Sequence, residues 1–135
     1  MDVKNFFRNI LNSSKGINLP QTVTDAFNNQ FNNPINTEWV KTEGYYEALF
    51  YKNEQEHIAR FKPDGKLISL KINLPLDMAP ELIRNAAKEQ GELMNAIAIQ
   101  DDNNLKYELI IRDDNLTRYF LLLNSAGEVL EKAKL

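Results

Sequence analysis

The sequence contains no cysteine and only one histidine, His57, among its 135 residues. A chain without cysteine forms no disulfide, holds no thiolate-bound zinc and has no thiol nucleophile. It also cannot build a two-histidine metal site, and a Ser-His-Asp triad would have to use His57, which has no serine close to it along the chain. We therefore expect a structural role for His57 and predict that the protein is not an enzyme.

Long hydrophobic runs are also absent. The longest are a few residues, whereas a membrane-spanning helix needs about 20. Arg8 and Asn9 interrupt the apolar residues near the start, so no secretory signal peptide is recognisable. The apolar residues here follow helical spacing on one stripe: Val3, Phe6, Phe7, Ile10 and Leu11. We predict an amphipathic helix over residues 3–11, within an accessory segment 1–18, that packs on the protein's own core.

Glycine is scarce, and each of the five glycines is explained by a predicted turn or helix cap. No GxGxxG or GxxxxGK motif occurs, so we predict no nucleotide site and no cofactor. The 16 Lys and Arg against 19 Asp and Glu give a net charge of −3, without a block of like charges. This balance argues against a nucleic-acid partner.

The rest of the composition, 43% hydrophobic and 26% charged, is typical of one globular domain. Periodicity and turn residues predict two helices, over residues 20–31 and from Pro80 to Gly91, each followed by four strands. The strands are expected at 37–42, 45–52, 57–61, 67–72, 96–100, 105–112, 117–124 and 128–135. Asp64-Gly65 marks a hairpin, because glycine takes the positive φ of a tight return.

This order of one helix and four strands, found twice, indicates an internal duplication. The matching residues are Pro20, Ala26 and Gln30 with Pro80, Ala86 and Gln90, Tyr46-Glu47 with Tyr107-Glu108, and Gly65 with Gly127. Each half buries too little surface alone, so we predict one domain, 19–135, composed of repeat one, 19–73, and repeat two, 77–135. The predicted fold class is α+β, with helices packed on one face of a curved antiparallel sheet.

Alternation along the strands assigns side chains to the two sheet faces. The predicted helix-covered residues are Tyr46, Ala48, Phe50, His57, Ala59, Phe61, Tyr107, Leu109, Ile111, Tyr119, Leu121 and Leu123. The opposite face is unusually apolar for a solvent-facing surface. Its candidate partner-binding residues are Leu49, Tyr51, Ile58, Arg60, Ile110, Phe120 and Leu122. Such a patch indicates a protein partner or self-association, unless the accessory helix covers it.

Two acidic clusters offer weak calcium candidates: Asp101 with Asp102, and Asp113 with Asp114. Neither has the glycine or the ligand spacing of a calcium loop, and such residues are also preferred in hairpin turns. We predict turn chemistry and no metal site. A calcium-responsive or small-ligand sensor remains the alternative function, if the fold brings the two loops together.

Several short stretches of packing and turn residues resemble one family. They are FNNP at 31–34 with Trp39, YEALF at 46–50, ARFKPDGKL at 59–67 and LP at 74–75. The chain from residue 19 onward is similar to the PepSY-like, beta-lactamase-inhibitor-like (BLIP-like) family of small bacterial proteins. The resemblance implies a duplicated α+β fold, a periplasmic or secreted setting and an unassigned role. It also implies that the sheet face away from the helices contacts a partner protein, as in the namesake inhibitors.

Overall fold

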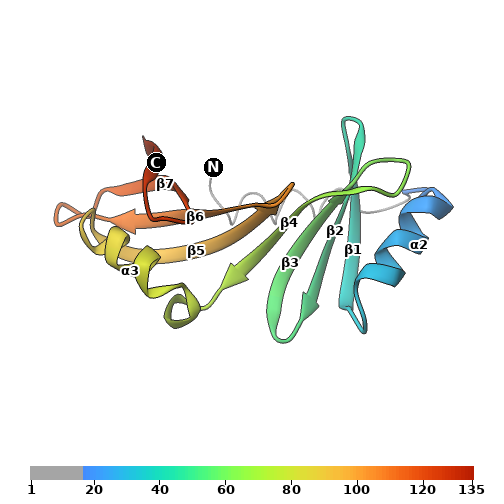
Figure 1. Ribbon diagram of the computed structural model, residues 1–135, viewed down its shortest axis with the longest axis horizontal. Coiled ribbons are helices and arrows are strands. Elements are labelled where there is room, and N and C mark those ends of the chain that lie inside the picture. Colours follow the sequence, from blue (N-terminus) through green and yellow to red (C-terminus); the bar gives the residue numbers. More distant parts are fainter. Residues whose placement is uncertain (1–16) are drawn as a thin grey trace. The chain divides into compact units, whose positions relative to one another are not determined.

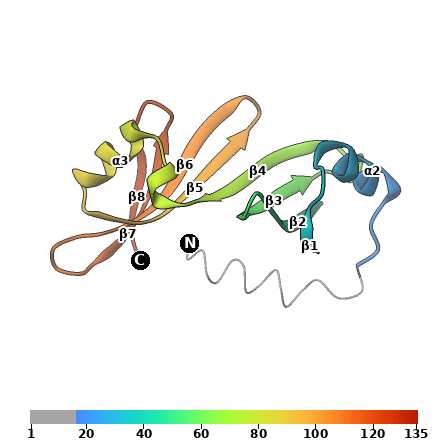
Figure 2. The same cartoon turned by 90° about the horizontal axis from the view of Figure 1, so that it is seen from below.

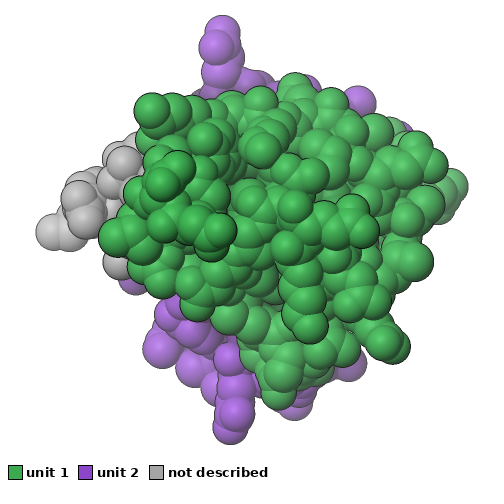
Figure 3. Space-filling view, turned by 90° about the vertical axis from the view of Figure 1, so that its left-hand side faces the viewer, with its two compact units in different colours: residues 1, 72–135 green, residues 2–71 purple. Residues whose placement is uncertain are grey.

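The computed structural model describes residues 17–135, which form an α+β fold with two α-helices and eight strands (Figure 1). Its chain divides into two compact units between Lys71 and Ile72, close to the end of predicted repeat one (Figure 3). We call them the first unit and the second unit. The helix predicted over residues 3–11 lies outside the described residues. No helix in the described range is long and apolar enough to cross a membrane.

The first unit contains one helix and an antiparallel meander. Its elements, in chain order, are α2 (Gln21–Gln30), β1 (Ile35–Thr42), β2 (Tyr45–Lys52), β3 (Gln55–Phe61) and β4 (Leu67–Leu74). The last residues of β4 already belong to the second unit. Consecutive strands are neighbours, and β2 pairs antiparallel with both β1 and β3. A bulge in β1 between Ile35 and Glu38 includes Asn36, whose φ is 53°.

The second unit repeats this order after a short 3-10 turn that the sequence did not predict (Figure 2). Its elements are η1 (Leu76–Met78), α3 (Glu81–Lys88), β5 (Glu92–Asp101), β6 (Asn104–Arg112), β7 (Arg118–Asn124) and β8 (Val129–Lys134). All four strands pair antiparallel with their chain neighbours in this unit. β5 starts at Glu92, earlier than predicted. The prediction missed its first residues because a bulge between Leu93 and Asn95 interrupts the side-chain alternation there.

Both helices begin directly after a proline. Pro20 and Pro80 have φ values of −58° and −53°, and their carbonyls accept the first helical hydrogen bonds. Val23 N and Thr24 N donate to Pro20 O over 3.0 and 3.2 Å, and the same two bonds recur at Pro80. Proline costs nothing here, because the first N–H groups of a helix have no intrahelical acceptor.

Two-residue turns close the β2–β3 and β5–β6 hairpins. Asn53 and Glu54 have φ values of 54° and 64°, and Asp102 and Asn103 have values of 44° and 71°. Positive φ at both central residues matches the right-handed twist of the flanking strands. Asparagine and aspartate tolerate this conformation, whereas the glutamate at position 54 pays a larger steric penalty.

The longer turns between β3 and β4 and between β7 and β8 each bring a glycine against the helix of their unit. A Cβ at Gly65 would lie 2.6 Å from Thr22 O and 3.5 Å from Ala26 Cβ. A Cβ at Gly127 would lie 3.2 Å from Leu82 Cδ2 and 3.6 Å from Ala86 Cβ. Ala26 and Ala86 are one of the pairs that the sequence alignment of the two halves matched. The two turns therefore approach their helices at equivalent positions.

The core of the first unit fills the space between α2 and the facing strands and is mostly aromatic. Its buried residues are Val23, Phe27, Phe31, Tyr46, Ala48, Phe50, Ala59 and Phe61. The Phe27 ring meets Trp39 and Phe50 edge-on, with centroids 5.1 Å apart in both pairs. Burial of these rings, together with their edge-to-face contacts, holds α2 on the sheet.

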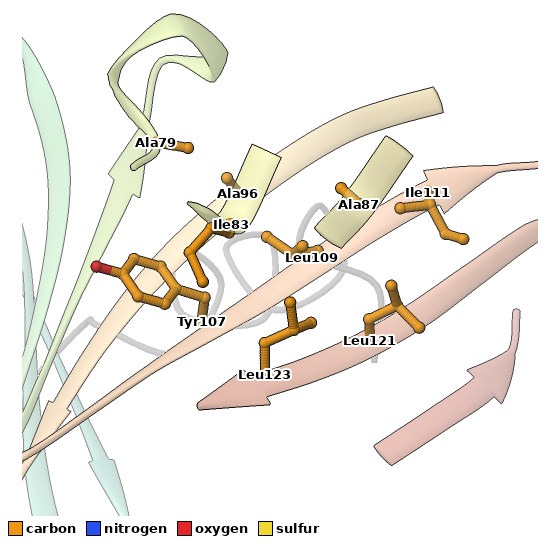
Figure 4. Close-up of a cluster of buried hydrophobic side chains, with 9 residues drawn as sticks. All are labelled: Ala79, Ile83, Ala87, Ala96, Tyr107, Leu109, Ile111, Leu121 and Leu123. Carbon is orange, nitrogen blue, oxygen red and sulfur yellow. The ribbon is translucent and has the colours of Figure 1, made fainter. Parts of the chain in front are cut away.

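The core of the second unit is aliphatic except for Tyr107 (Figure 4). Its buried residues are Ala79, Ile83, Ala87, Ala96, Tyr107, Leu109, Ile111, Leu121 and Leu123. The predicted helix-covered face is confirmed in both units, except that Tyr119 is half-buried. Strand register also matches: Tyr46 faces Phe61 in the first unit, and Tyr107 faces Leu123 in the second. These parallels support the predicted duplication, which remains a prediction.

Candidate binding surface

The sheet face that points away from α2, which we call the first outer face, is partly covered. Leu49 and Ile58 are only 6% and 5% exposed, and they form a cluster with Val40. Ile17, where the described chain begins, packs against this cluster. The prediction that Leu49 and Ile58 are solvent-exposed is therefore wrong. Alternation placed both side chains on the correct face, but it does not indicate what covers that face.

A buried carboxylate lies beside this cluster. Glu47 is 3% exposed, and its Oε1 accepts a hydrogen bond from Arg60 Nη2 over 3.3 Å. The Arg60 guanidinium also lies over the Tyr45 ring, 5.2 Å from its centroid. The burial of Glu47 was not predicted from the sequence. The available signal was its position directly opposite Arg60 in the β2–β3 hairpin.

Tyr51, at the other end of the same face, is 38% exposed, as the partner-surface prediction requires. Its hydroxyl donates to Glu56 Oε1 over 3.1 Å. Burial of the ring edge and the negative charge of Glu56 together raise the pKa of Tyr51. Along β2, exposure on this face thus increases from Glu47 and Leu49 to Tyr51.

In the second unit, the sheet face away from α3, which we call the second outer face, carries a more accessible apolar patch. Ile110 on β6 lies opposite Phe120 on β7, and Phe120 lies opposite Ala133 on β8. Leu122 is the next residue of β7 on the same face. Ile110, Phe120 and Leu122 are all half-buried. The register therefore brings these three predicted residues together on neighbouring strands.

Charges of both signs surround this patch. Glu108 and Glu131 occupy the positions on either side of Leu122. Arg112 and Arg118 face each other in the next row, where Arg112 Nη2 donates to Glu92 Oε2 over 2.8 Å. An apolar centre inside a mixed polar rim is the usual composition of a protein interface.

The acidic candidates for calcium do not come together. Asp101 and Asp102 lie at the start of β6 and Asp113 and Asp114 at its end, so the length of the strand, about 27 Å, separates them. The two loops therefore cannot share an ion, and the possibility that the fold brings them together is excluded. Within residues 17–135 no group of three or more metal-binding side chains of the His, Cys, Asp and Glu type occurs.

The second acidic loop is a hydrogen-bonded turn, as its sequence indicated. Asp113 Oδ1 accepts from the backbone N–H groups of Asn115 and Thr117, both over 2.9 Å. Asp113 N donates to Thr117 O over 2.9 Å and closes the loop. The carboxylate therefore satisfies the backbone of its own turn.

His57 has the structural role that was expected. It is 6% exposed, its ring stacks on Phe50 at 5.2 Å, and its Nδ1 lies 2.9 Å from Gln55 O. Because a carbonyl only accepts, Nδ1 carries the proton. Burial lowers the pKa of His57, with a smaller contribution from Lys52, while the bond to Gln55 opposes the shift.

Solved structures share this fold over most of the chain. A provisionally periplasmic protein from Bacteroides eggerthii is 22% identical, with a TM-score of 0.78 over 87% of this chain and 90% of that one. A DUF2874 family protein from Bacteroides uniformis is 20% identical, with a TM-score of 0.76 over 85% and 88%. A BLIP-like protein from Bacteroides fragilis is 14% identical, with a TM-score of 0.76 over 90% and 89%.

The class that these structures define is the BLIP-like α+β fold, so the resemblance noted in the sequence is confirmed at the level of fold. No protein-family model matches the sequence. No curated protein matches it either. The function must therefore be argued from the surface of this chain.

Proposed function

We propose that this protein is a non-enzymatic, inhibitor-like binding module that uses its second outer face to contact another folded protein. The observation that carries the proposal is the half-buried apolar row of Ile110, Phe120 and Leu122 inside a rim of both charges. Patches of this composition on a soluble domain mark protein-contact sites. The mixed rim favours a protein over a nucleic acid or an anionic membrane, which would require a basic surface.

The remaining predicted contact residues differ in their accessibility. Tyr51 and Arg60 on the first outer face remain accessible, and we propose them as secondary contacts. Leu49 and Ile58 are buried, so we expect them to stabilise the fold and not to contact a partner directly. A non-enzymatic role is supported by the position of His57, the sole histidine, inside the core. The fold likeness to a provisionally periplasmic protein supports a periplasmic or secreted location.

The proposal is tested with Phe120→Asp, which places a charge at the centre of the patch. Leu116→Asp is the matched control, because Leu116 is 71% exposed and lies in the β6–β7 turn, outside the patch. Affinity capture with wild-type protein and each variant is followed by measuring the affinity of the purified pair. We expect Phe120→Asp to abolish binding and Leu116→Asp to retain it. Equal binding by both variants would reject this surface, and self-association lost only in Phe120→Asp would identify the partner as a second copy.

A further inference from the structure

The second outer face is ordered into three rows that run across its strands, and we call them the cationic row, the apolar row and the acidic row. In that order, the rows contain Glu92 with Arg112 and Arg118, Ile110 with Phe120 and Ala133, and Glu108 with Leu122 and Glu131. Alternate residues of an antiparallel strand are about 6.8 Å apart, so the two charged rows lie about 14 Å apart, on opposite sides of the apolar row.

Each charged row contains one exposed charge without an ion-pair partner in the described chain. In the cationic row, Arg112 donates to Glu92, which leaves Arg118 on β7. In the acidic row, Glu131 lies on β8 beside Leu122. Both Arg118 and Glu131 are exposed, and neither forms an ion pair with any residue in the range 17–135. The face therefore presents a free cation at one end and a free anion at the other.

This pattern of charge is complementary to itself when one copy is inverted against another. Two copies that meet face to face with their strands aligned can be related by a two-fold axis in one of two directions. An axis along the strands would place the cationic row against the cationic row of the second copy. An axis along the apolar row places each cationic row against the acidic row of the other copy. Electrostatic complementarity favours the second arrangement.

The side chains suit this second arrangement. The apolar row lies on the axis, so Phe120 faces Phe120 of the second copy. Arg118 then lies over Leu122 of the second copy, next to its Glu131, and the same contact occurs again by symmetry. Packed sheets are about 10 Å apart, which an arginine and a glutamate side chain span together.

From these observations we infer that the partner of the second outer face is a second copy of this chain, packed about a two-fold axis along the apolar row. The inference rests on the proposed function, because it names the partner of the same surface. The three rows cover about 14 Å in each direction across β5–β8, which makes a small interface. Small interfaces give weak, reversible association, so we expect a dimer that forms as the protein concentration increases.

The test is to exchange the two free charges and measure the mass by sedimentation equilibrium over a concentration series. Arg118→Glu and Glu131→Lys should each weaken the dimer by about tenfold or more, because each turns two symmetric attractions into repulsions. The variant with both substitutions should dimerise like the wild type, since the charges are exchanged but still complementary. An equal mixture of the two single variants should also form dimers, although neither does so alone at the same concentration.

Matched controls make the same charge changes on the other side of the sheet. Lys88→Glu and Glu89→Lys lie at the end of α3, where both residues are exposed. We expect both controls to dimerise like the wild type. Equal weakening by the controls and by the row variants, or no recovery in the double variant, would overturn the inference.

The outcome separates this inference from the proposed function. A wild-type protein that stays monomeric at every concentration would overturn the inference. Capture of a foreign protein by the wild type, but not by Phe120→Asp, would then still support the proposed function. A dimer that persists in Phe120→Asp would place the contact between copies elsewhere and would also overturn the inference. If no partner of either kind depends on Phe120, the proposed function is rejected as well.

Discussion

Glu47 and Arg60 occupy directly opposite positions on β2 and β3, with 3.3 Å between Glu47 Oε1 and Arg60 Nη2. The carboxylate side chain is 4% exposed and the guanidinium side chain is 39% exposed, so the pair links a buried anion to a solvated cation. A buried charge without its partner is unfavourable, because neither water nor protein then compensates for its lost hydration. The ion pair therefore allows a charge to be buried on an otherwise apolar face.

Arg60→Gln should destabilise the protein by about 1–2 kcal/mol, because it removes the cation that compensates Glu47. Glu47→Gln should cost less, since a buried neutral amide is easier to accommodate than a lone carboxylate. The double variant should be more stable than the sum of the two losses predicts. Urea unfolding of all four proteins measures this coupling, and strictly additive losses would contradict it.

The stability of the protein should decrease as the pH falls from 7 to 5.5. Because burial lowers the pKa of His57 in the folded state, the unfolded chain binds the proton first, near its ordinary pKa of about 6.5. The contribution of His57 to the free energy of unfolding is therefore fully present above pH 6.5. It decreases below that pH, by at most about 1.4 kcal/mol per pH unit for one proton. His57→Phe, which preserves an aromatic ring against Phe50, should flatten this dependence. An unchanged slope in His57→Phe would exclude His57 as its cause.

Substitutions at three glycines with positive φ distinguish the cost of backbone strain from the cost of steric overlap. Gly44→Ala should cost about 1–2 kcal/mol from strain alone, since its φ is 80° and no atom lies within 4 Å of the new Cβ. Gly65→Ala should cost about 1–3 kcal/mol more, because its Cβ would meet the fixed Thr22 carbonyl oxygen at 2.6 Å. Gly127→Ala should fall between them, since the flexible Leu82 side chain can move. Denaturant midpoints measure this order, and equal losses would contradict it.

Two adjacent residues of α3 test the core of the second unit. Ile83 is fully buried in that core, so Ile83→Ala should destabilise by about 2–5 kcal/mol through the lost contacts and the cavity. Leu82 is 52% exposed, and Leu82→Ala should cost about 0.5 kcal/mol. Thermal unfolding monitored by circular dichroism measures both, and similar losses would contradict the assigned orientation of α3.

Much of the fold could be predicted from the sequence because its signals are local. Alternation in YEALF at 46–50 assigned Tyr46, Ala48 and Phe50 to the helix-covered face, where the structure places them. Proline marked the starts of both helices, although each begins one residue later, at Gln21 and Glu81. Asp-Gly and the Asx-rich loops predicted turns. In two of these turns the aspartate side chain accepts a hydrogen bond from a backbone N–H two residues later.

The accessibility of the candidate surface could not be predicted in the same way. Alternation indicates which face of a sheet a side chain occupies, but coverage depends on contacts between residues distant in sequence. Leu49 and Ile110 are matched by the predicted duplication and have similar chemistry, yet Leu49 is buried and Ile110 is only half-buried.

The β2–β3 turn contains a position at which a substitution could stabilise the protein. Glu54 holds a φ of 64°, a conformation that glycine adopts without the steric penalty of a Cβ. Replacing it with glycine would relieve that penalty at an exposed turn position. The scarcity of glycine noted at the outset thus leaves a margin for improvement, and a more robust scaffold is accessible without altering either outer face.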